Sequence, residues 1–193
     1  NRTTVQLIQR GNDRNVLSQA ALIDSLELQR EIQQSDSIGP TLAEQQPIFG
    51  VANVLAQTQL QRQARQSAPP EGGQGAGDAA GNESAAGAQQ QAPPSIEEQI
   101  DALEGLSEEE LDALVQEVLG EDGNPQAVAL MPSGYDAGST TANAHVTFIT
   151  QITEGGSVES PEGLGDRITD SQLAIRDLAN ERDFEYTVFG AGI

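Results

Sequence analysis

The stretch that decides the fold is Asn143–Thr153, which has the sequence NAHVTFITQIT. β-Branched and aromatic residues dominate it, and alternate positions of a strand point to opposite faces. The two faces carry Val146, Phe148, Thr150 and Ile152 on one side and His145, Thr147, Ile149 and Gln151 on the other. We therefore predict a long β-strand here and interpret the other segments outward from it.

The segments on either side of this strand have the signals of a mixed α and β domain. Downstream, the sequence predicts a helix over Gly165–Arg182 and a last strand over Glu185–Ile193. Upstream, Thr3–Arg10 is a predicted first strand, and Ser18 is a good N-cap for a helix that ends near Gln34. A strand–helix unit therefore opens the chain and a strand–helix–strand unit closes it.

A long insertion separates these two units. Apolar residues at helical spacing predict a helix over Pro47–Arg65, with Pro47 in its first turn. Gln66–Pro94 is rich in Gly, Ala, Gln and Pro, and nothing in it can bury enough surface to offset chain entropy. We interpret Gln66–Pro94 as a flexible linker.

Two capping boxes follow the linker. Ser95–Glu98 and Ser107–Glu110 both match S-x-x-E and open apolar runs, so they predict an αα-hairpin. We interpret this hairpin as a lid or clip. The next apolar run, Ala127–Met131, is a candidate short strand, and 132–142 reads as a loop.

These elements predict an α+β fold, a ferredoxin-like split βαβ sandwich with a helical insertion. The expected organisation is 1–65 for the first half of the sandwich with an extra helix, 66–94 for the linker, 95–122 for the hairpin and 123–193 for the second half.

The chain is strongly acidic, with 9 basic and 30 acidic residues and a formal net charge of −21. All of the basic residues are arginine: Arg2, Arg10, Arg14, Arg30, Arg62, Arg65, Arg167, Arg176 and Arg182. A lysine-free, acid-rich, Ala/Gly-rich composition resembles that of proteins from salt-in halophiles. Molar salt shortens the Debye length to about 3 Å, so we expect the fold to need salt.

Composition also excludes several classes of function. A chain this acidic would repel nucleic-acid phosphates and anionic lipid surfaces. It has no cysteine, which excludes disulfides, thiolate catalysis and cysteine-based metal sites. No apolar run reaches the ~18 residues of a membrane-spanning helix.

The sequence supports no catalytic, cofactor or metal site, and we expect a protein that is not an enzyme. His145 is the only histidine, and we interpret it as a partly exposed strand residue because a metal needs several convergent ligands. Glu108–Glu110 with Asp112 fits the favourable placement of acids in a first helical turn. No serine lies in a G-x-S-x-G elbow.

Two weaker candidates remain. Tyr135, Ser139, Thr140 and Thr141 precede the long strand and could line a substrate groove or an interface. The alternative is that their hydroxyls satisfy backbone groups. Asn82 lies in an N-x-S sequon within the linker and is a candidate glycosylation site. We assign Phe148, Phe184 and Phe189 to the core rather than to ligand contacts.

Three segments carry a resemblance to a known family. They are NVLSQAALIDSLELQREI at 15–32, ALMPSGYDAGSTTANAHVTFITQI at 129–152 and DSQLAIRDLANE at 170–181. They resemble an extracytoplasmic, porter-type domain of resistance–nodulation–division (RND) superfamily exporters, in the MMPL/Patched-like branch found in halophilic archaea. The resemblance covers most of the chain apart from 66–94, and its motifs are structural.

The resemblance implies a non-catalytic role at the extracellular face of a cell membrane. The implied partners are transmembrane helices and a second ectodomain of the same parent chain, a homo-oligomer, and lipidic or amphiphilic cargo. The strands at both ends of the chain are expected to lie in one sheet and to continue toward two membrane crossings. The alternative is a free-standing interaction module that binds through the 95–122 hairpin.

Overall fold

The computed structural model describes residues 2–44, 46–67, 94–152 and 162–190, with the side chains of 162–166 excepted. Within them the protein is α+β, with six α-helices and a four-stranded antiparallel sheet of order β2-β3-β1-β4. The strands are β1 (Arg2–Arg10), β2 (Ile48–Gly50), β3 (Ala144–Ile152) and β4 (Glu185–Phe189). The helices are α1 (Gln19–Gln34), α2 (Val51–Ser67), α3 (Ile96–Glu104), α4 (Glu108–Leu119), α5 (Pro125–Val128) and α6 (Glu162–Asn180), with a 3₁₀ turn at Gly39–Thr41.

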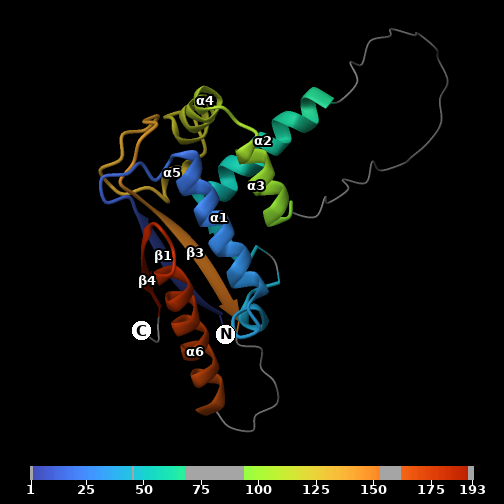
Figure 1. Ribbon diagram of the computed structural model, residues 1–193, viewed down its shortest axis with the longest axis vertical. Helices are drawn as coiled ribbons and strands as arrows, with labels where there is room; N and C mark the ends of the chain where they lie inside the picture. Colours follow the sequence, from blue (N-terminus) through green and yellow to red (C-terminus); the bar gives the residue numbers. More distant parts are fainter. Residues whose placement is uncertain (1, 45, 68–93, 153–161, 191–193) are drawn as a thin grey trace, which may run out of the picture.

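The sheet is built around β1 and the predicted long strand β3. They pair antiparallel over nine residues, from Arg2 opposite Ile152 to Arg10 opposite Ala144. β4 adds to the other side of β1, so the start of β1 and the end of β4 lie at the same end of the sheet. Figure 1 shows α1 and α6 on one face of this sheet.

Helix α1 is shared by two apolar cores. Its Ala21, Leu28 and Ile32 pack with the helix-covered face of the sheet and with α6. Its Leu22 and Leu26 pack with α2, α3 and α4 in a second core. The apolar residues of this helix therefore serve two layers at once, and Ser18 caps it as predicted.

A buried polar hub joins the helices where these layers meet. Asn53 of α2 donates from Nδ2 to Gln29 Oε1 of α1 at 2.8 Å and to Gln99 Oε1 of α3 at 2.9 Å. Its Oδ1 accepts from the backbone of Gly50 at the end of β2, at 2.9 Å. Because these side chains are all buried, the hub fixes the relative positions of three helices and one strand.

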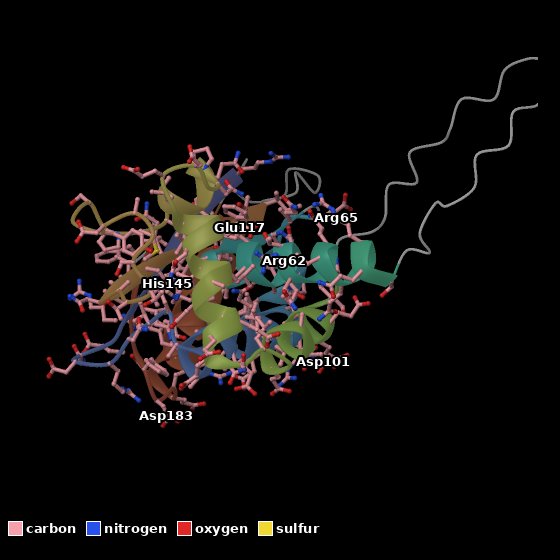
Figure 2. All side chains as sticks on the ribbon, turned by 90° about the horizontal axis from the view of Figure 1, so that it is seen from above. Arg62, Arg65, Asp101, Glu117, His145 and Asp183 are labelled. Carbon is pink, nitrogen blue, oxygen red and sulfur yellow. The ribbon has the colours of Figure 1, made fainter. Side chains whose placement is uncertain are left out.

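The two predicted capping boxes are present. Ser95 and Ser107 each accept from the third backbone N–H of their helix, and the matching Glu98 and Glu110 bond back. The apolar sides of α3 and α4 are buried against α1 and α2. The hairpin is therefore packed against the body of the protein, and its interpretation as a lid or clip stays a prediction. Arg62 of α2 forms an ion pair with Glu117 of α4, and the two residues are labelled next to each other in Figure 2.

Two predicted elements differ in the structure. The predicted helix over Pro47–Arg65 begins only at Val51, because Ile48–Gly50 forms β2 against β3. A Cβ added at Gly50 would lie 2.5 Å from Thr147 Oγ1, so glycine allows this close approach. The predicted strand Ala127–Met131 instead begins in the short helix α5, which Asn124 caps and Pro125 opens, and continues as a turn after Val128.

Most of the predicted linker lies outside the described residues, and so does the candidate glycosylation site Asn82. In the part of the chain that the structure covers, none of the helices combines the length and the apolar character that a membrane span requires.

Candidate functional site

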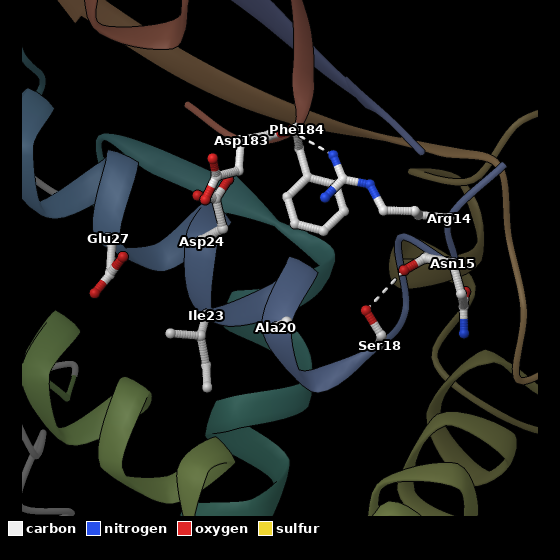
Figure 3. A pocket seen from close by; sticks show the side chains of 9 residues that line it. All are labelled: Arg14, Asn15, Ser18, Ala20, Ile23, Asp24, Glu27, Asp183 and Phe184. Atoms are coloured by element: carbon white, nitrogen blue, oxygen red, sulfur yellow. Dashed lines mark hydrogen bonds between the residues drawn. The ribbon is translucent and has the colours of Figure 1, made fainter. Parts of the chain in front are cut away.

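A cavity of about 500 Å³ opens where the first half of α1 meets the connection from α6 to β4. Its lining residues are Arg14, Asn15, Ser18, Ala20, Ile23, Asp24, Glu27, Asp183 and Phe184. Figure 3 shows the Phe184 ring between the Arg14 side chain and the carboxylates of Asp183 and Asp24, with Glu27 further away and Ala20 and Ile23 below the ring. The cavity therefore combines one aromatic ring, one cation and an excess of acids.

A tight turn brings Arg14 into the cavity. Asn12 and Asp13 adopt positive φ angles of 43° and 77°, a region that Asn and Asp tolerate better than most residues. The Arg14 guanidinium then lies 4.1 Å from the centroid of the Phe184 ring and donates to the carbonyl of Asp183. The quadrupole of the ring attracts the guanidinium in this position and helps to hold it there.

The acids beside the cavity are organised by Arg182, which is only 12% exposed. Its guanidinium lies 3.6 Å from Asp24, 3.3 Å from Glu27 and 2.8 Å from Glu31, all on α1. One cation thus links the end of α6 to nearly two turns of α1. Two of these acids, Asp24 and Glu27, also line the cavity, so Arg182 holds part of its acidic lining in place.

Asp24 of the cavity lining is paired with the buried Tyr186. The Tyr186 hydroxyl donates to Asp24 Oδ2 at 2.6 Å. Burial raises the pKa of Asp24 above its usual value, although the hydrogen bond from Tyr186 and the charge of Arg182 oppose that shift. Burial also raises the pKa of Tyr186, and the bond to Asp24 adds to this. Tyr186 therefore stays protonated as a donor at physiological pH.

The lining groups are committed to structural contacts more than to reaction chemistry. The Ser18 hydroxyl donates to the carbonyl of Asn15 and accepts from the Ala21 backbone as a helix cap. Asp24 is held by Tyr186 and Arg182. Such a preorganised, acidic corner suits contact with a cationic or hydrogen-bonding surface, since its charges are already in place.

The sequence-predicted residues Tyr135, Ser139, Thr140 and Thr141 lie together in the loop before β3, outside the cavity lining. Their hydroxyls and carbonyls bond within the loop: Tyr135 donates to the Ser139 carbonyl, and Ser139 donates to the Thr141 carbonyl at 2.9 Å. Asn15 connects the loop to the cavity, because its Nδ2 donates to the Thr140 carbonyl at 2.8 Å. The groove hypothesis for these residues stays a prediction.

Two side chains are placed differently from their sequence interpretation. His145 is 1% exposed and lies on the helix-covered face of β3, so it is a core residue and not a partly exposed one. Burial lowers the pKa of His145 to about 4. Phe189, assigned to the core, is 50% exposed.

The sequence did not indicate the cavity, because its parts come from distant segments. Arg14 and Phe184 are 170 positions apart and meet only once β4 has paired with β1. Only part of the cavity could have been found from the sequence. Asn12-Asp13 is a typical turn sequence, and the arginine that follows it stands out in an acidic chain. The acidic first turn of α4, Glu108–Glu110, is exposed as expected of helix-capping acids.

In comparisons with known proteins, no family model matches the chain, and no significant match is found to a curated protein or to a solved structure.

Proposed function

We propose that this chain is a non-catalytic, extracytoplasmic porter-type domain of an RND superfamily exporter, of the MMPL/Patched-like branch. In this proposal the fold is a ferredoxin-like split βαβ sandwich with a helical insertion. The domain would move as a rigid body against a second ectodomain of the same chain, at the extracellular face of a membrane, and so open and close a path for lipidic or amphiphilic cargo.

The observation that carries the proposal is the arrangement of the sheet. Its order β4-β1-β3-β2, with all neighbours antiparallel and with α1 and α6 on one face, is the arrangement expected when two βαβ units interlock. Because β1 and β4 are adjacent and antiparallel, the start of one and the end of the other lie at the same end of the sheet. That geometry suits a domain inserted between two successive membrane helices.

The flanking sequence of the complete gene provides the first test. We expect an apolar run of about 20 residues shortly before Asn1 and another shortly after Ile193, each long enough to span a bilayer. Polar flanks on both sides would rule out the exporter assignment.

The second test measures on which side of the membrane the domain lies. The chain has no cysteine, so Ser133→Cys, at an exposed loop position, introduces one thiol in a parent protein whose other cysteines are replaced by serine. We expect a membrane-impermeant maleimide to label this thiol in intact cells. The matched control is the same parent without Ser133→Cys. Labelling that appears only after lysis would contradict an extracellular position.

One observation favours the alternative of a free-standing interaction module. The outward sides of α3 and α4 expose a run of acids, while their apolar sides are buried. These acids are Glu97, Glu98, Asp101, Glu104, Glu108, Glu109, Glu110, Asp112 and Glu117. In this alternative, the exposed acids of the 95–122 hairpin would bind a partner with a basic surface through electrostatic attraction. Polar gene flanks would favour this alternative.

A further inference from the structure

Several buried polar atoms have no hydrogen-bond partner among the described residues, and they gather in one place. Apart from Arg182, whose guanidinium is paired with Glu31, they are Gln9 Oε1, Ser25 Oγ, Gln29 Nε2 and the two ring nitrogens of His145. Each of these four side chains is at most 1% exposed. Buried polar groups in folded proteins are nearly always hydrogen-bonded, so a concentration of unpaired ones has to have a physical cause.

The four side chains form a column between the sheet and α1. Gln9 of β1 and His145 of β3 are opposite each other in the strand register, and Cβ atoms of such pairs are about 5 Å apart. Gln9 Nε2 donates to the Ala21 carbonyl of α1 at 3.1 Å. In a helix the backbone N–H of Ser25 is directed at the same carbonyl, so the Gln9 amide lies beside Ser25. Gln29 follows Ser25 by one helical turn on the same side of α1. We call Gln9, Ser25, Gln29 and His145 the polar column.

Backbone contacts at both ends of the polar column determine which amide atoms are free. The Gln9 side chain faces a carbonyl, which can only accept, so its amide nitrogen donates there and Oε1 is left as an acceptor. Asn53 Oδ1 accepts from the backbone N–H of Gly50, which can only donate. Asn53 Nδ2 therefore donates to Gln29 Oε1, and Gln29 Nε2 is left as a donor.

The free atoms of the polar column are a mixture of donors and acceptors without a charge. The neutral imidazole of His145 has one nitrogen of each kind, and the Ser25 hydroxyl can both donate and accept. A cation in the column would meet the N–H donors of Gln29, and an anion would meet Gln9 Oε1. A water molecule donates twice and accepts twice, so it matches this mixture where an ion does not.

We propose that the polar column is a binding site for internal water, in which about two water molecules bridge His145, Gln9, Ser25 and Gln29. A buried water makes about three hydrogen bonds, so two of them are enough to pair all of the free atoms. These waters would extend the hydrogen-bonded hub around Asn53 as far as β1 and β3, and so tie α1 to the centre of the sheet. The inference rests on the packing of this chain and does not depend on the exporter proposal.

The first test counts long-lived internal waters by ¹⁷O magnetic relaxation dispersion, in molar salt and with circular dichroism as the check on folding. The variant combines Gln9→Leu and His145→Leu, which replaces an opposed polar pair by an apolar pair and is tolerated better than the loss of one partner. The matched control is Gln6→Leu, at an exposed position of the same strand. We expect the double variant to lose about one or two long-lived waters, and the control to keep the number found in the unmodified chain.

The second test is a high-resolution crystal structure of the unmodified chain, which decides the question even if the double variant does not fold. We expect ordered water within about 3.2 Å of Gln9 Oε1 and of a ring nitrogen of His145. Side chains of the column that bond directly to each other with no water between them would overturn the proposal, and so would an ion in the column. An equal number of long-lived waters in the folded double variant and the unmodified chain would also overturn it.

Discussion

At the level of single side chains, the most informative residue is His145. It is fully buried beneath the helices, and neither ring nitrogen has a hydrogen-bond partner among the described residues. Its neighbour across the strands is the uncharged Gln9, whose Oε1 is also without a partner. Nothing here compensates a charged imidazole, so burial keeps the ring neutral and lowers its pKa to about 4.

This environment predicts a loss of stability in mild acid. The unfolded chain binds a proton near pH 6.5 and the folded chain only near pH 4. The free energy of unfolding should therefore fall as the pH drops from 6.5 toward 4. At about 1.4 kcal/mol per pH unit, the total effect is about 3 kcal/mol. Urea unfolding in molar salt, repeated across this range, measures it.

His145→Leu isolates this effect, because all other titrating groups are the same in both proteins. The variant should not show the loss of stability in acid that His145 causes. The unfolding free energy of the unmodified protein minus that of the variant should therefore fall by about 3 kcal/mol between pH 6.5 and pH 4. Parallel pH profiles would show that His145 does not titrate in the unfolding equilibrium.

Asn53 is the second residue with a large expected effect. Asn53→Ala removes the shared partner of Gln29, Gln99 and the Gly50 amide, and leaves these buried groups unpaired. We expect a loss of about 3 kcal/mol in unfolding free energy, since each unsatisfied buried group costs about 1–3 kcal/mol. Denaturant unfolding measures this loss. Gln63→Ala, at an exposed position of the same helix, is the control and should change stability by less than about 0.5 kcal/mol.

At the level of helices and strands, the capping boxes test whether the hairpin belongs to the folded body. Ser95→Ala and Ser107→Ala each remove one side of a box and should each destabilise the protein by about 1 kcal/mol. Because α3 and α4 are buried against α1 and α2, we expect this loss in the single global transition. The measurement is denaturant unfolding, with Ser133→Ala in an exposed loop as the control.

The opposite result would be informative in the same experiment. A separate early transition that alone responds to Ser95→Ala and Ser107→Ala would mean that the hairpin unfolds as its own unit. It would then behave as the lid that the sequence first suggested.

The elements that sequence reasoning predicted correctly are those with local signals. β3 shows alternation over its whole length, and α1, α3 and α4 each begin at a serine cap. The two errors have different causes. Ile48–Gly50 becomes a strand only because β3 offers it a partner about 100 residues away. For α5, the apolar run was ambiguous, and the cap Asn124 with Pro125 was the better guide.

The candidate site was less predictable than the fold because its residues, like those of β2, come from distant segments of the chain. The loop residues around Tyr135 were chosen for their chemistry, and their hydrogen bonds lie within the loop itself. The cavity depends on Arg14, Arg182 and Phe184 meeting α1, which requires the complete sheet. The pattern of apolar and polar residues within one segment does not predict contacts between distant segments.

Over the whole molecule, charge is distributed very unevenly. The described ion pairs involve Arg30, Arg62 and Arg182, and they neutralise only a few of the 30 acids of the chain. The exposed side of the hairpin and the lining of the cavity are both acidic. Mutual repulsion among these acids opposes the compact state in dilute buffer, and salt reduces it.

We therefore expect the folded structure to require salt. Circular dichroism should show substantial loss of helix in dilute buffer and recovery in molar KCl. The matched variant combines Glu97→Gln, Glu104→Gln and Glu109→Gln, which spares the capping residues Glu98 and Glu110. Removing three charges changes the net charge from −21 to −18 and should lower the KCl concentration at the folding midpoint. Equal spectra in dilute and molar salt would contradict the expectation. An unchanged midpoint in the variant would instead indicate that specific ion binding, and not screening, makes the fold depend on salt.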